Sequence, residues 1–180
     1  MNRKFILIIA GFTITVPGFF LFSYWYLGIF SSIEGAPLQP FVARVYAAEH
    51  SGDYNKTGEK VVQTRRLLKS YALPCQPVLI YHDNAIVTGK AYLKSSGGCI
   101  TDEKLPAHVE AALRQNGMNA VSLKIPSGYQ FKTYAQTAVA LRKVWPEIAR
   151  LTDKGAVLKF PLVHLVRDDG TNEFLIGTGP

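Results

Sequence analysis

Aromatic residues at regular spacing are the side chains of this chain with the clearest capacity for binding chemistry. Residues 128–134 alternate with period two, which predicts a half-buried strand with Tyr129, Phe131 and Tyr134 on one face. Large aromatic rings can stack on a flat or cationic ligand. The alternative is that these rings simply fill a core, which is the commoner role for any single aromatic residue. The other predicted members of this wall are Tyr54, Tyr81 and Trp145.

His164 is the histidine with the best case for a role at a ligand site. An imidazole can act as a general base or as a hydrogen-bond donor to a ligand. The alternative is a histidine whose hydrogen bonds are satisfied on a strand face. No serine or cysteine partner can be identified for it, so no catalytic residue is assigned.

The remaining histidines and the glycines predict neither a metal nor a cofactor. His50, His82 and His108 are dispersed and lack the spacing of metal ligands. The chain contains no GxGxxG or Walker pattern that would cradle a phosphate. We therefore expect no metal and no cofactor.

The chain has two cysteines, Cys75 and Cys99. They form no CxxC motif, and their spacing matches no metal-binding motif. In an oxidising compartment they could form a disulfide, provided that the fold brings them together. The sequence leaves a disulfide and two buried thiols equally open.

An apolar run near the N-terminus predicts where the protein works. Phe5 to Phe30 is a stretch of 26 residues without a charged side chain, and it ends near Tyr24, Trp25 and Tyr26. As a helix it would be roughly 39 Å long, whereas a bilayer core is roughly 30 Å thick. A cleaved signal peptide is the alternative, but its apolar region is shorter, about 7–15 residues. We predict a single-pass signal anchor over residues 1–31, with the lipid bilayer as its partner.

The charges that flank this run predict its direction. Arg3 and Lys4 precede the run, and the first basic residue after it is Arg44. The positive-inside rule therefore places the N-terminus in the cytoplasm and the domain outside. In a bacterium this favours an inner-membrane protein with its domain in the periplasm. A domain that faces the cytosol stays open.

The overall charge is basic but argues against a nucleic-acid surface. The chain has 20 Lys and Arg against 13 Asp and Glu, a net charge of +7. These basic residues are scattered, and no basic run is interleaved with aromatic residues as nucleic-acid binding would require. We expect no nucleic-acid partner.

The order of predicted elements indicates an internal repeat. Two βαββ units, at about 41–101 and 118–180, follow a linker at 32–40 and form one α+β domain with pseudo-twofold symmetry. A cleft between the two units is the natural ligand site. A bulge or bend is expected at Gly97-Gly98, and a kink or break at Pro146. The predicted strands are 41–48, 77–81, 91–101, 119–125, 128–134, 158–167 and 172–176, and the predicted helices are 56–71, 107–116 and about 138–151.

Two motifs carry a resemblance to a known family. The turn HSGDY at 50–54, followed by a helix, resembles the first repeat of the gyrase-inhibitor-like, or bacterial effector-binding, family of small-molecule-binding domains. IPSGY at 125–129, followed by Phe131 and a helix, resembles its second repeat. YHDN at 81–84 and RKVWP at 142–146 are similar to a membrane-anchored member, an autophagy receptor of the endoplasmic reticulum. The resemblance covers roughly residues 36–178.

The resemblance implies a cleft that is lined by aromatic residues and binds amphipathic, cationic or aromatic small molecules. Some members of the family hydrolyse electrophilic cyclopropane compounds. The family often places a glutamate in the penultimate strand, where this chain has His164. We therefore expect a membrane-anchored binding domain that is not an enzyme. The alternatives are a hydrolase that uses His164 or an acidic residue, and an adaptor that binds a protein. The expected ligand-contacting residues are Tyr54, Tyr81, Tyr129, Phe131, Tyr134, Trp145 and His164.

Overall fold

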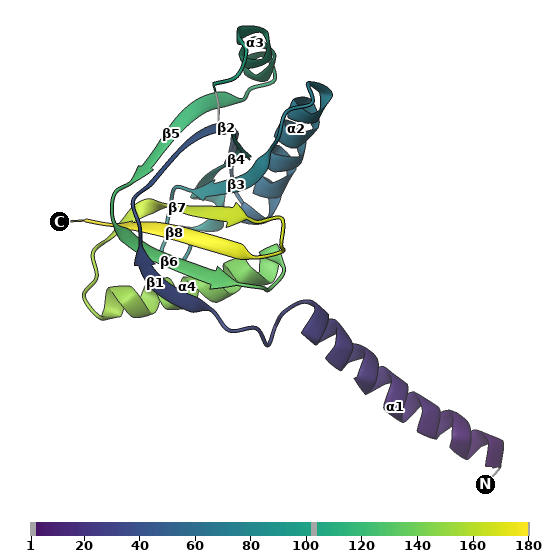
Figure 1. The fold of residues 1–180 in the computed structure, drawn as a ribbon. Coiled ribbons are helices and arrows are strands. Elements are labelled where there is room, and N and C mark those ends of the chain that lie inside the picture. Colours follow the sequence, from purple (N-terminus) through teal and green to yellow (C-terminus); the bar gives the residue numbers. More distant parts are fainter. Residues whose placement is uncertain (1–2, 102–103, 180) are drawn as a thin grey trace.

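A computed structural model describes residues 3–101 and 104–179, without the side chains of residues 3–14. Within them the chain forms eight strands and four α-helices, together with two short 3-10 turns (Figure 1). The helices are α1 (Arg3–Tyr26), α2 (Thr57–Ser70), α3 (Ala107–Gln115) and α4 (Thr137–Asp153), and the 3-10 turns are Tyr54–Lys56 and Lys90–Tyr92. The strands are β1 (Glu34–Leu38), β2 (Phe41–Ser51), β3 (Gln76–Tyr81), β4 (Lys94–Ile100), β5 (Asn119–Ile125), β6 (Gly128–Thr133), β7 (Leu158–Val166) and β8 (Asn172–Thr178).

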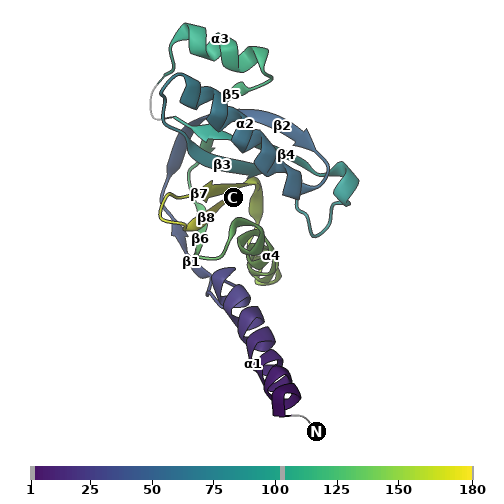
Figure 2. The same cartoon turned by 90° about the vertical axis from the view of Figure 1, so that its right-hand side faces the viewer.

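Helix α1 projects away from the domain, as Figures 1 and 2 show from two directions. Its described large apolar side chains, from Val16 to Tyr26, are exposed. Within the part of the chain whose side chains are described, no helix combines the length and the hydropathy that crossing a bilayer requires. Residues 5–14 of the predicted span have side chains that lie outside this description.

The strands form one antiparallel sheet whose order reflects the predicted repeat. The order is β1-β6-β8-β7-β3-β4-β2-β5. Strand β3 of the first βαββ unit pairs with β7 of the second at the centre, with Val78 opposite Leu165. On either side of this pair follow β4 and β2, or β8 and β6, so the two units are related as a pseudo-twofold axis would relate them. This is the α+β arrangement expected of a gyrase-inhibitor-like fold.

The two ends of this sheet are joined, because its terminal ladders are one continuous pairing. Strand β1 pairs with β6 up to Leu38 opposite Gly128. Strand β2 pairs with β5 from Phe41 opposite Ile125, three residues after Leu38 and three before Gly128, so the antiparallel register is the same. Strands β1 and β2 therefore act as one long bent strand, and β5 and β6 as another. The sheet closes on itself as a barrel-like ring.

The predicted linker at 32–40 was wrong in part, because it contains strand β1. Gly35, Ala36 and Pro37 offer little β-propensity, and a proline is compatible only with the edge of a sheet. Strand β1 is such an edge: β6 is its neighbour in the sheet order, and Pro37 lies opposite Tyr129 of that strand. The tertiary pairing, which the local pattern does not encode, makes this segment a strand.

The predicted bulge at Gly97-Gly98 is absent from the described ladder. Strand β4 pairs with β2 without interruption from Lys94 to Ile100. These glycines instead permit close approach. A Cβ at Gly97 would lie 2.5 Å from the Thr57 carbonyl of α2, and one at Gly98 would lie 2.0 Å from the Tyr46 carbonyl of β2. The missing side chain at Gly97 lets α2 lie directly on the sheet, and the missing side chain at Gly98 lets β4 lie close to β2.

The predicted break at Pro146 does not occur. Helix α4 continues from Thr137 to Asp153 with the proline inside it. Its apolar face holds the helix in place, because Ala140, Val144 and Ile148 are all buried against the sheet. Packing of this stripe outweighs the loss of one backbone hydrogen bond.

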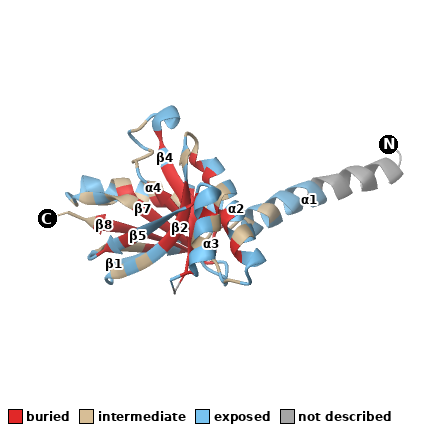
Figure 3. Ribbon diagram, turned by 90° about the horizontal axis from the view of Figure 1, so that it is seen from above, coloured by how far each residue is buried: buried red, intermediate tan, exposed pale blue. Residues whose placement is uncertain are grey.

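The two faces of the sheet carry different side chains (Figure 3 shows the buried strands). One face encloses an aliphatic cluster made by strands alone, which we call the barrel interior. The other face is covered by α2 and α4, and further along by α2 and α3, and includes the aromatic residues. The buried members of the barrel interior are Val45, Ala47, Val78, Ile80, Ile100, Leu123, Ile125, Val163, Leu165 and Leu175.

Candidate functional site

A row of aromatic rings lies between the sheet and helices α2 and α4, and we call it the aromatic row. The Tyr54 and Tyr81 ring centroids are 4.6 Å apart, and Tyr54 stacks on Trp145 of α4 at 6.4 Å. Trp145 in turn stacks on Phe160 at 6.3 Å. Both repeats contribute to the row, so the arrangement joins the two halves of the domain at the predicted cleft.

His164 continues the row at its inner end. Its ring lies 6.2 Å from Tyr81 and 4.0 Å from Phe174. Its Nε2 lies 2.8 Å from the side-chain oxygen of Asn172, and its Nδ1 lies 3.3 Å from the Tyr81 hydroxyl. The Asn172 amide donates to the Ala135 carbonyl, so its oxygen faces the imidazole as an acceptor. The imidazole therefore donates from Nε2 and accepts at Nδ1.

Burial makes this histidine a neutral residue. His164 has 0 % of its surface exposed. Desolvation lowers the pKa of His164 to about 4, against a smaller opposing effect of the bond to Asn172. Both ring nitrogens have partners, and none of these is a nucleophile. In this geometry the imidazole cannot reach a substrate, which argues against its use as the base of a hydrolase.

The tyrosines of the row are held in their neutral form as well. Burial raises the pKa of Tyr54 to about 12 and also raises the pKa of Tyr81. The Tyr54 hydroxyl donates to the Asp83 carbonyl at 2.8 Å, which fixes the ring at the start of α2. The row thus presents apolar ring faces with anchored polar ends and carries no charge of its own.

The inner part of the row is closed and its outer part is accessible. Tyr81 and His164 are fully buried, whereas Trp145 and Phe160 are only partly buried. The Tyr54 ring lies against both Tyr81 and Trp145, so the row itself occupies the cleft predicted from the repeat. A ligand would reach it first at Trp145 and Phe160.

The other predicted strand residues lie in two different places. Phe131 is buried in the cluster that contains the row, and Tyr129 packs against that cluster. Tyr134 lies apart, with 72 % of its surface exposed. It is out of phase with Tyr129 and Phe131 by one residue and follows the end of β6 at Thr133. The prediction that all three share a face was therefore wrong for Tyr134.

Three members of this site were not predicted from the sequence. Phe160 lies on the same face of β7 as His164, four residues away, and period-two alternation from His164 would have identified it. Asn172 and Phe174 come from β8 and meet His164 across the strand pair, with His164 opposite Phe174. The pairing of β7 with β8 brings them together, and no local pattern marks them.

Glu173 is the buried acid of this part of the domain, but it lies on the other face of β8. Its carboxylate accepts hydrogen bonds from Arg167 and from Gln130, and Lys132 lies 3.0 Å away. Burial alone would raise the pKa of Glu173, but these donors and cations lower it overall. The carboxylate is committed to structural partners and does not face the aromatic row.

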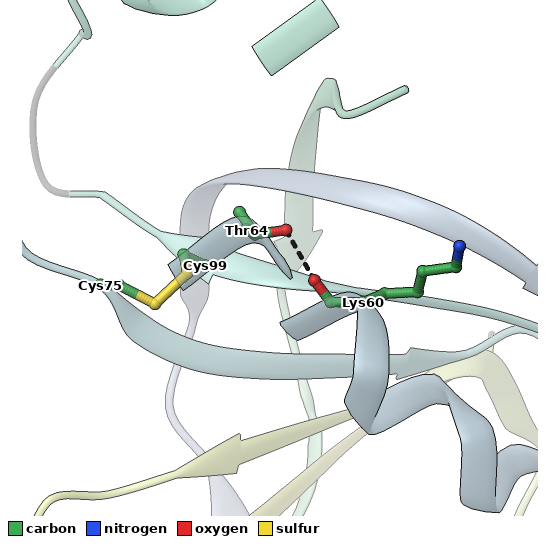
Figure 4. The surroundings of a disulfide bond; sticks show 4 residues. All are labelled: Lys60, Thr64, Cys75 and Cys99. Carbon is green, nitrogen blue, oxygen red and sulfur yellow. Dashed lines mark hydrogen bonds between the residues drawn. A yellow bond between two sulfur atoms is a disulfide. The ribbon is translucent and has the colours of Figure 1, made fainter. Parts of the chain in front are cut away.

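Cys75 and Cys99 form a disulfide between the start of β3 and the end of β4. Figure 4 shows the bridge beside the turn of α2 that carries Thr64, whose hydroxyl donates to the Lys60 carbonyl. Cys99 is fully buried in the cluster beneath α2 and α3. Of the two alternatives that the sequence left open, the structure has the disulfide.

Two large hollows on the described surface are lined by no residue of the row. One of 580 Å³ lies beside Phe41 and Gln76, and one of 620 Å³ runs along the outer side of α2 beside Arg65, Arg66 and Lys69. Within the described residues no group of three or more potential metal ligands comes together. The aromatic row is therefore the part of the domain in which aromatic residues from both repeats converge.

Comparison with known proteins places the fold but does not assign a family. No protein-family model matches the chain, and no curated protein matches it. Among solved structures, an uncharacterized conserved protein from Listeria innocua has a TM-score of 0.58 at 8% identity, covering 81% of this chain and 92% of that one. A hydrolase from Listeria innocua has a TM-score of 0.55 at 10% identity, with the same coverage.

The C-terminal domain of EcmrR is a further structural neighbour. It has a TM-score of 0.52 at 12% identity and covers 83% of this chain and 98% of the domain. At these identities the likeness shows the fold alone, which is that of effector-binding-like domains. None of these three neighbours supports the predicted likeness to an autophagy receptor. EcmrR has also been solved in complex with DNA, so the expected absence of a nucleic-acid partner stays a prediction.

Proposed function

We propose that this domain binds an uncharged aromatic or amphipathic small molecule between α2 and α4, on the aromatic row. The observation that supports this most strongly is the convergence of rings from both repeats, from Phe160 and Trp145 at the surface to Tyr54 and Tyr81 inside. Stacked rings with anchored hydroxyl groups offer apolar faces and few directional contacts. Such a site suits flat molecules of varied shape.

Binding requires that Trp145 move, because the row now fills its own site. The following residue, Pro146, has no N–H, so the Arg142 carbonyl lacks its usual donor four residues on. This turn of α4 is therefore held less firmly than its neighbours. We infer that the Trp145 ring rotates outward and the ligand enters between it and Tyr54, stacked on both rings.

The charges around the row favour an uncharged ligand over a cation. His164, which stands where the related family often has a glutamate, is neutral near pH 7 because its pKa is about 4. The Asp83 carboxylate accepts the Lys94 backbone N–H at 2.6 Å. Glu173 lies on the opposite face and is paired with Arg167 and Lys132. A cationic ligand would gain little from any of these groups.

Tryptophan fluorescence tests this proposal directly. Trp25→Phe leaves Trp145 as the single tryptophan, and the full chain in detergent is then titrated with neutral, cationic and anionic aromatic amphiphiles. We expect neutral compounds to quench or shift the Trp145 emission and to raise the unfolding temperature. Trp145→Ala should abolish the thermal shift, whereas Tyr92→Ala, at a residue 79 % exposed outside the row, should leave it unchanged. A thermal shift that survives Trp145→Ala would contradict the site.

We also propose that α1 anchors the domain to a membrane. The supporting observation is a helix that projects from the domain with its described apolar residues exposed, among them Phe19, Phe22 and Trp25. A large exposed apolar surface of this kind marks a site of contact with a membrane or with another protein. Retention of the full chain in bacterial membranes after alkaline extraction would support the anchor, and its release would contradict it.

For the side of the membrane, we propose the periplasmic face of a bacterial inner membrane. Arg3 and Lys4 precede the apolar run, and the positive-inside rule then puts the domain outside. The Cys75–Cys99 disulfide supports the same side, because disulfides persist in oxidising compartments. In intact cells with a permeabilised outer membrane, an impermeant thiol reagent should label the cysteines only after reduction. An absence of labelling even after reduction would contradict this placement, whereas labelling without reductant would contradict the disulfide.

A further inference from the structure

The segment that follows α1 is fixed to the domain by contacts from Leu27 and Ser31. The Gln136 backbone N–H donates to the Leu27 carbonyl at 3.1 Å. The Ser31 hydroxyl lies 3.0 Å from that of Thr133, and Lys143 of α4 donates to the Ser31 carbonyl. These bonds reach β6, the start of α4 and its second turn. The helix and the domain are therefore joined by a structured junction.

Gly28 makes the junction tight. Its φ is +71°, a conformation that favours glycine, and a Cβ at this position would lie 2.5 Å from the Ala135 Cα. Ala135 is buried there, and the two backbones touch. Such an approach leaves the domain little freedom to swing about the end of α1.

Exposed aromatic side chains surround this junction, both on α1 and on the domain. Trp25 and Tyr26 close α1 with 70 % and 67 % of their surfaces exposed, and Tyr134 of the domain is 72 % exposed. Tyr26 and Tyr134 line the same hollow, together with the start of α4. Tyrosine and tryptophan with an apolar body and a polar end are enriched where a bilayer meets water.

Chain geometry limits how far Tyr134 can lie from the end of α1. Gln136 lies within hydrogen-bond reach of Leu27, and Tyr134 is two residues earlier, a span of at most about 7 Å. The headgroup layer on each side of a bilayer is about 5–7 Å thick. If α1 ends at the edge of the hydrocarbon core, Tyr134 must lie within or beside the headgroups.

We propose that the face formed by Tyr134 and the start of α4 rests on the bilayer at the headgroup level, with Tyr134 inserted beside Trp25 and Tyr26. This rests on the proposed membrane anchor. The opposite end of the domain, where α3 packs on the C-terminal part of α2, then points away from the membrane (Figure 2). The contact depends on aromatic residues and not on charge, because Asp168 and Asp169 are exposed in the neighbouring β7–β8 turn. Neutral lipid should therefore suffice.

Depth-dependent quenching tests the docked face. In a Trp25→Phe, Trp145→Phe background of the full chain, Tyr134→Trp places a single reporter on the proposed face. Tyr71→Trp places it at the distal end, where Tyr71 packs edge-on against His108 of α3. Both variants are reconstituted into phosphatidylcholine vesicles that contain lipid brominated on the acyl carbons nearest the headgroup.

Flotation of the vesicles separates the anchor from the docked face. If the protein floats with the vesicles, we expect bromolipid to quench the reporter at 134 several-fold more than the reporter at 71. Equal quenching of both reporters, or of neither, in protein that floats would overturn the docked face while leaving the anchor intact. Protein that does not float would overturn the anchor, and the docked face with it.

Discussion

The barrel interior and the helix-covered face are built from the same strands but from different chemistry. On β7, Val163 and Leu165 point into the barrel, whereas Leu162 and His164 point toward the helices. The buried interior cluster consists of aliphatic residues enclosed by hydrogen-bonded strands. The helix-covered cluster mixes aliphatic residues with aromatic rings, and its lid is formed by helices that are not hydrogen-bonded to the sheet ladder.

This difference separates stability from adaptability. A closed strand ladder cannot move inward to fill a space without breaking backbone hydrogen bonds. Its interior must therefore be filled by side chains of the right volume. Helices lie on side chains and can shift by small amounts. The groups that could respond to a ligand or to pH, such as Trp145 and His164, lie on the helix-covered face. We therefore assign stability to the barrel and the proposed binding site to the helix-covered face.

Matched truncations on one strand test this separation with the largest expected effect. Leu165→Ala and Leu162→Ala delete the same atoms on opposite faces of β7, and both residues are buried. Large-to-small changes of this kind cost about 2–5 kcal/mol, and more where the site cannot collapse. We expect Leu165→Ala to cost the upper part of that range and Leu162→Ala about 1 kcal/mol less. Urea unfolding of the full chain in detergent measures both, and a larger loss for Leu162→Ala would reverse the comparison.

Removal of the disulfide should have the next largest effect. Cys75 and Cys99 are separated by 24 positions, and a bridge across such a loop contributes about 2–4 kcal/mol. The double variant Cys75→Ser, Cys99→Ser should lose this much of the free energy of unfolding. Reductant should destabilise the unsubstituted protein similarly and leave the double variant unchanged. A wild-type stability that reductant does not alter would show that the bridge does not support this end of the helix-covered face.

The sequence predicts the repeats better than it predicts the site. Period-two and period-3.6 patterns locate most of the strands and helices, because each buries one face of a single core. The patterns miss β1, where Pro37 and Gly35 argue against a strand, and they cannot predict that the sheet closes. At this closure the alternation changes phase: Ile125 faces the barrel and Tyr129 faces the helices, although the two are four residues apart.

The same limit explains the residues of the site. Tyr54, Tyr81 and Trp145 are large and apolar, so their burial could be expected, but their contact arises from the pairing of β3 with β7. Asn172 and Phe174 reach His164 across β7 and β8. Long-range pairing of this kind leaves no local signal. Tyr134 is the reverse case, since one residue of phase puts it outside the site.

The pH dependence of stability should report on His164, which lies on the helix-covered face. A buried neutral histidine with a pKa of about 4, below the ordinary 6.5, contributes stability that is full above pH 6.5 and is lost as pH falls toward 4. At roughly 1.4 kcal/mol per pH unit, the free energy of unfolding should fall by about 2 kcal/mol between pH 7 and pH 5. His164→Gln cannot titrate and keeps a side-chain donor for Asn172. Its pH dependence over this interval should be flatter by that amount, and parallel profiles would contradict the assignment.

Trp145→Phe should give the smallest change in stability and a clear change in binding. Trp145 is partly buried and packs between Tyr54 and Phe160, so a smaller ring keeps most of the stacking. Because Trp145 is only partly buried, we expect a cost near that of a typical substitution, about 1 kcal/mol. Affinity for a neutral aromatic ligand should nevertheless change several-fold, because this ring is the one that a ligand must displace or stack upon. Unfolding in urea and ligand titration of the same preparation compare the two effects. A stability loss as large as that of Leu165→Ala, with unchanged affinity, would make Trp145 part of the fixed core and would remove the distinction between the two faces.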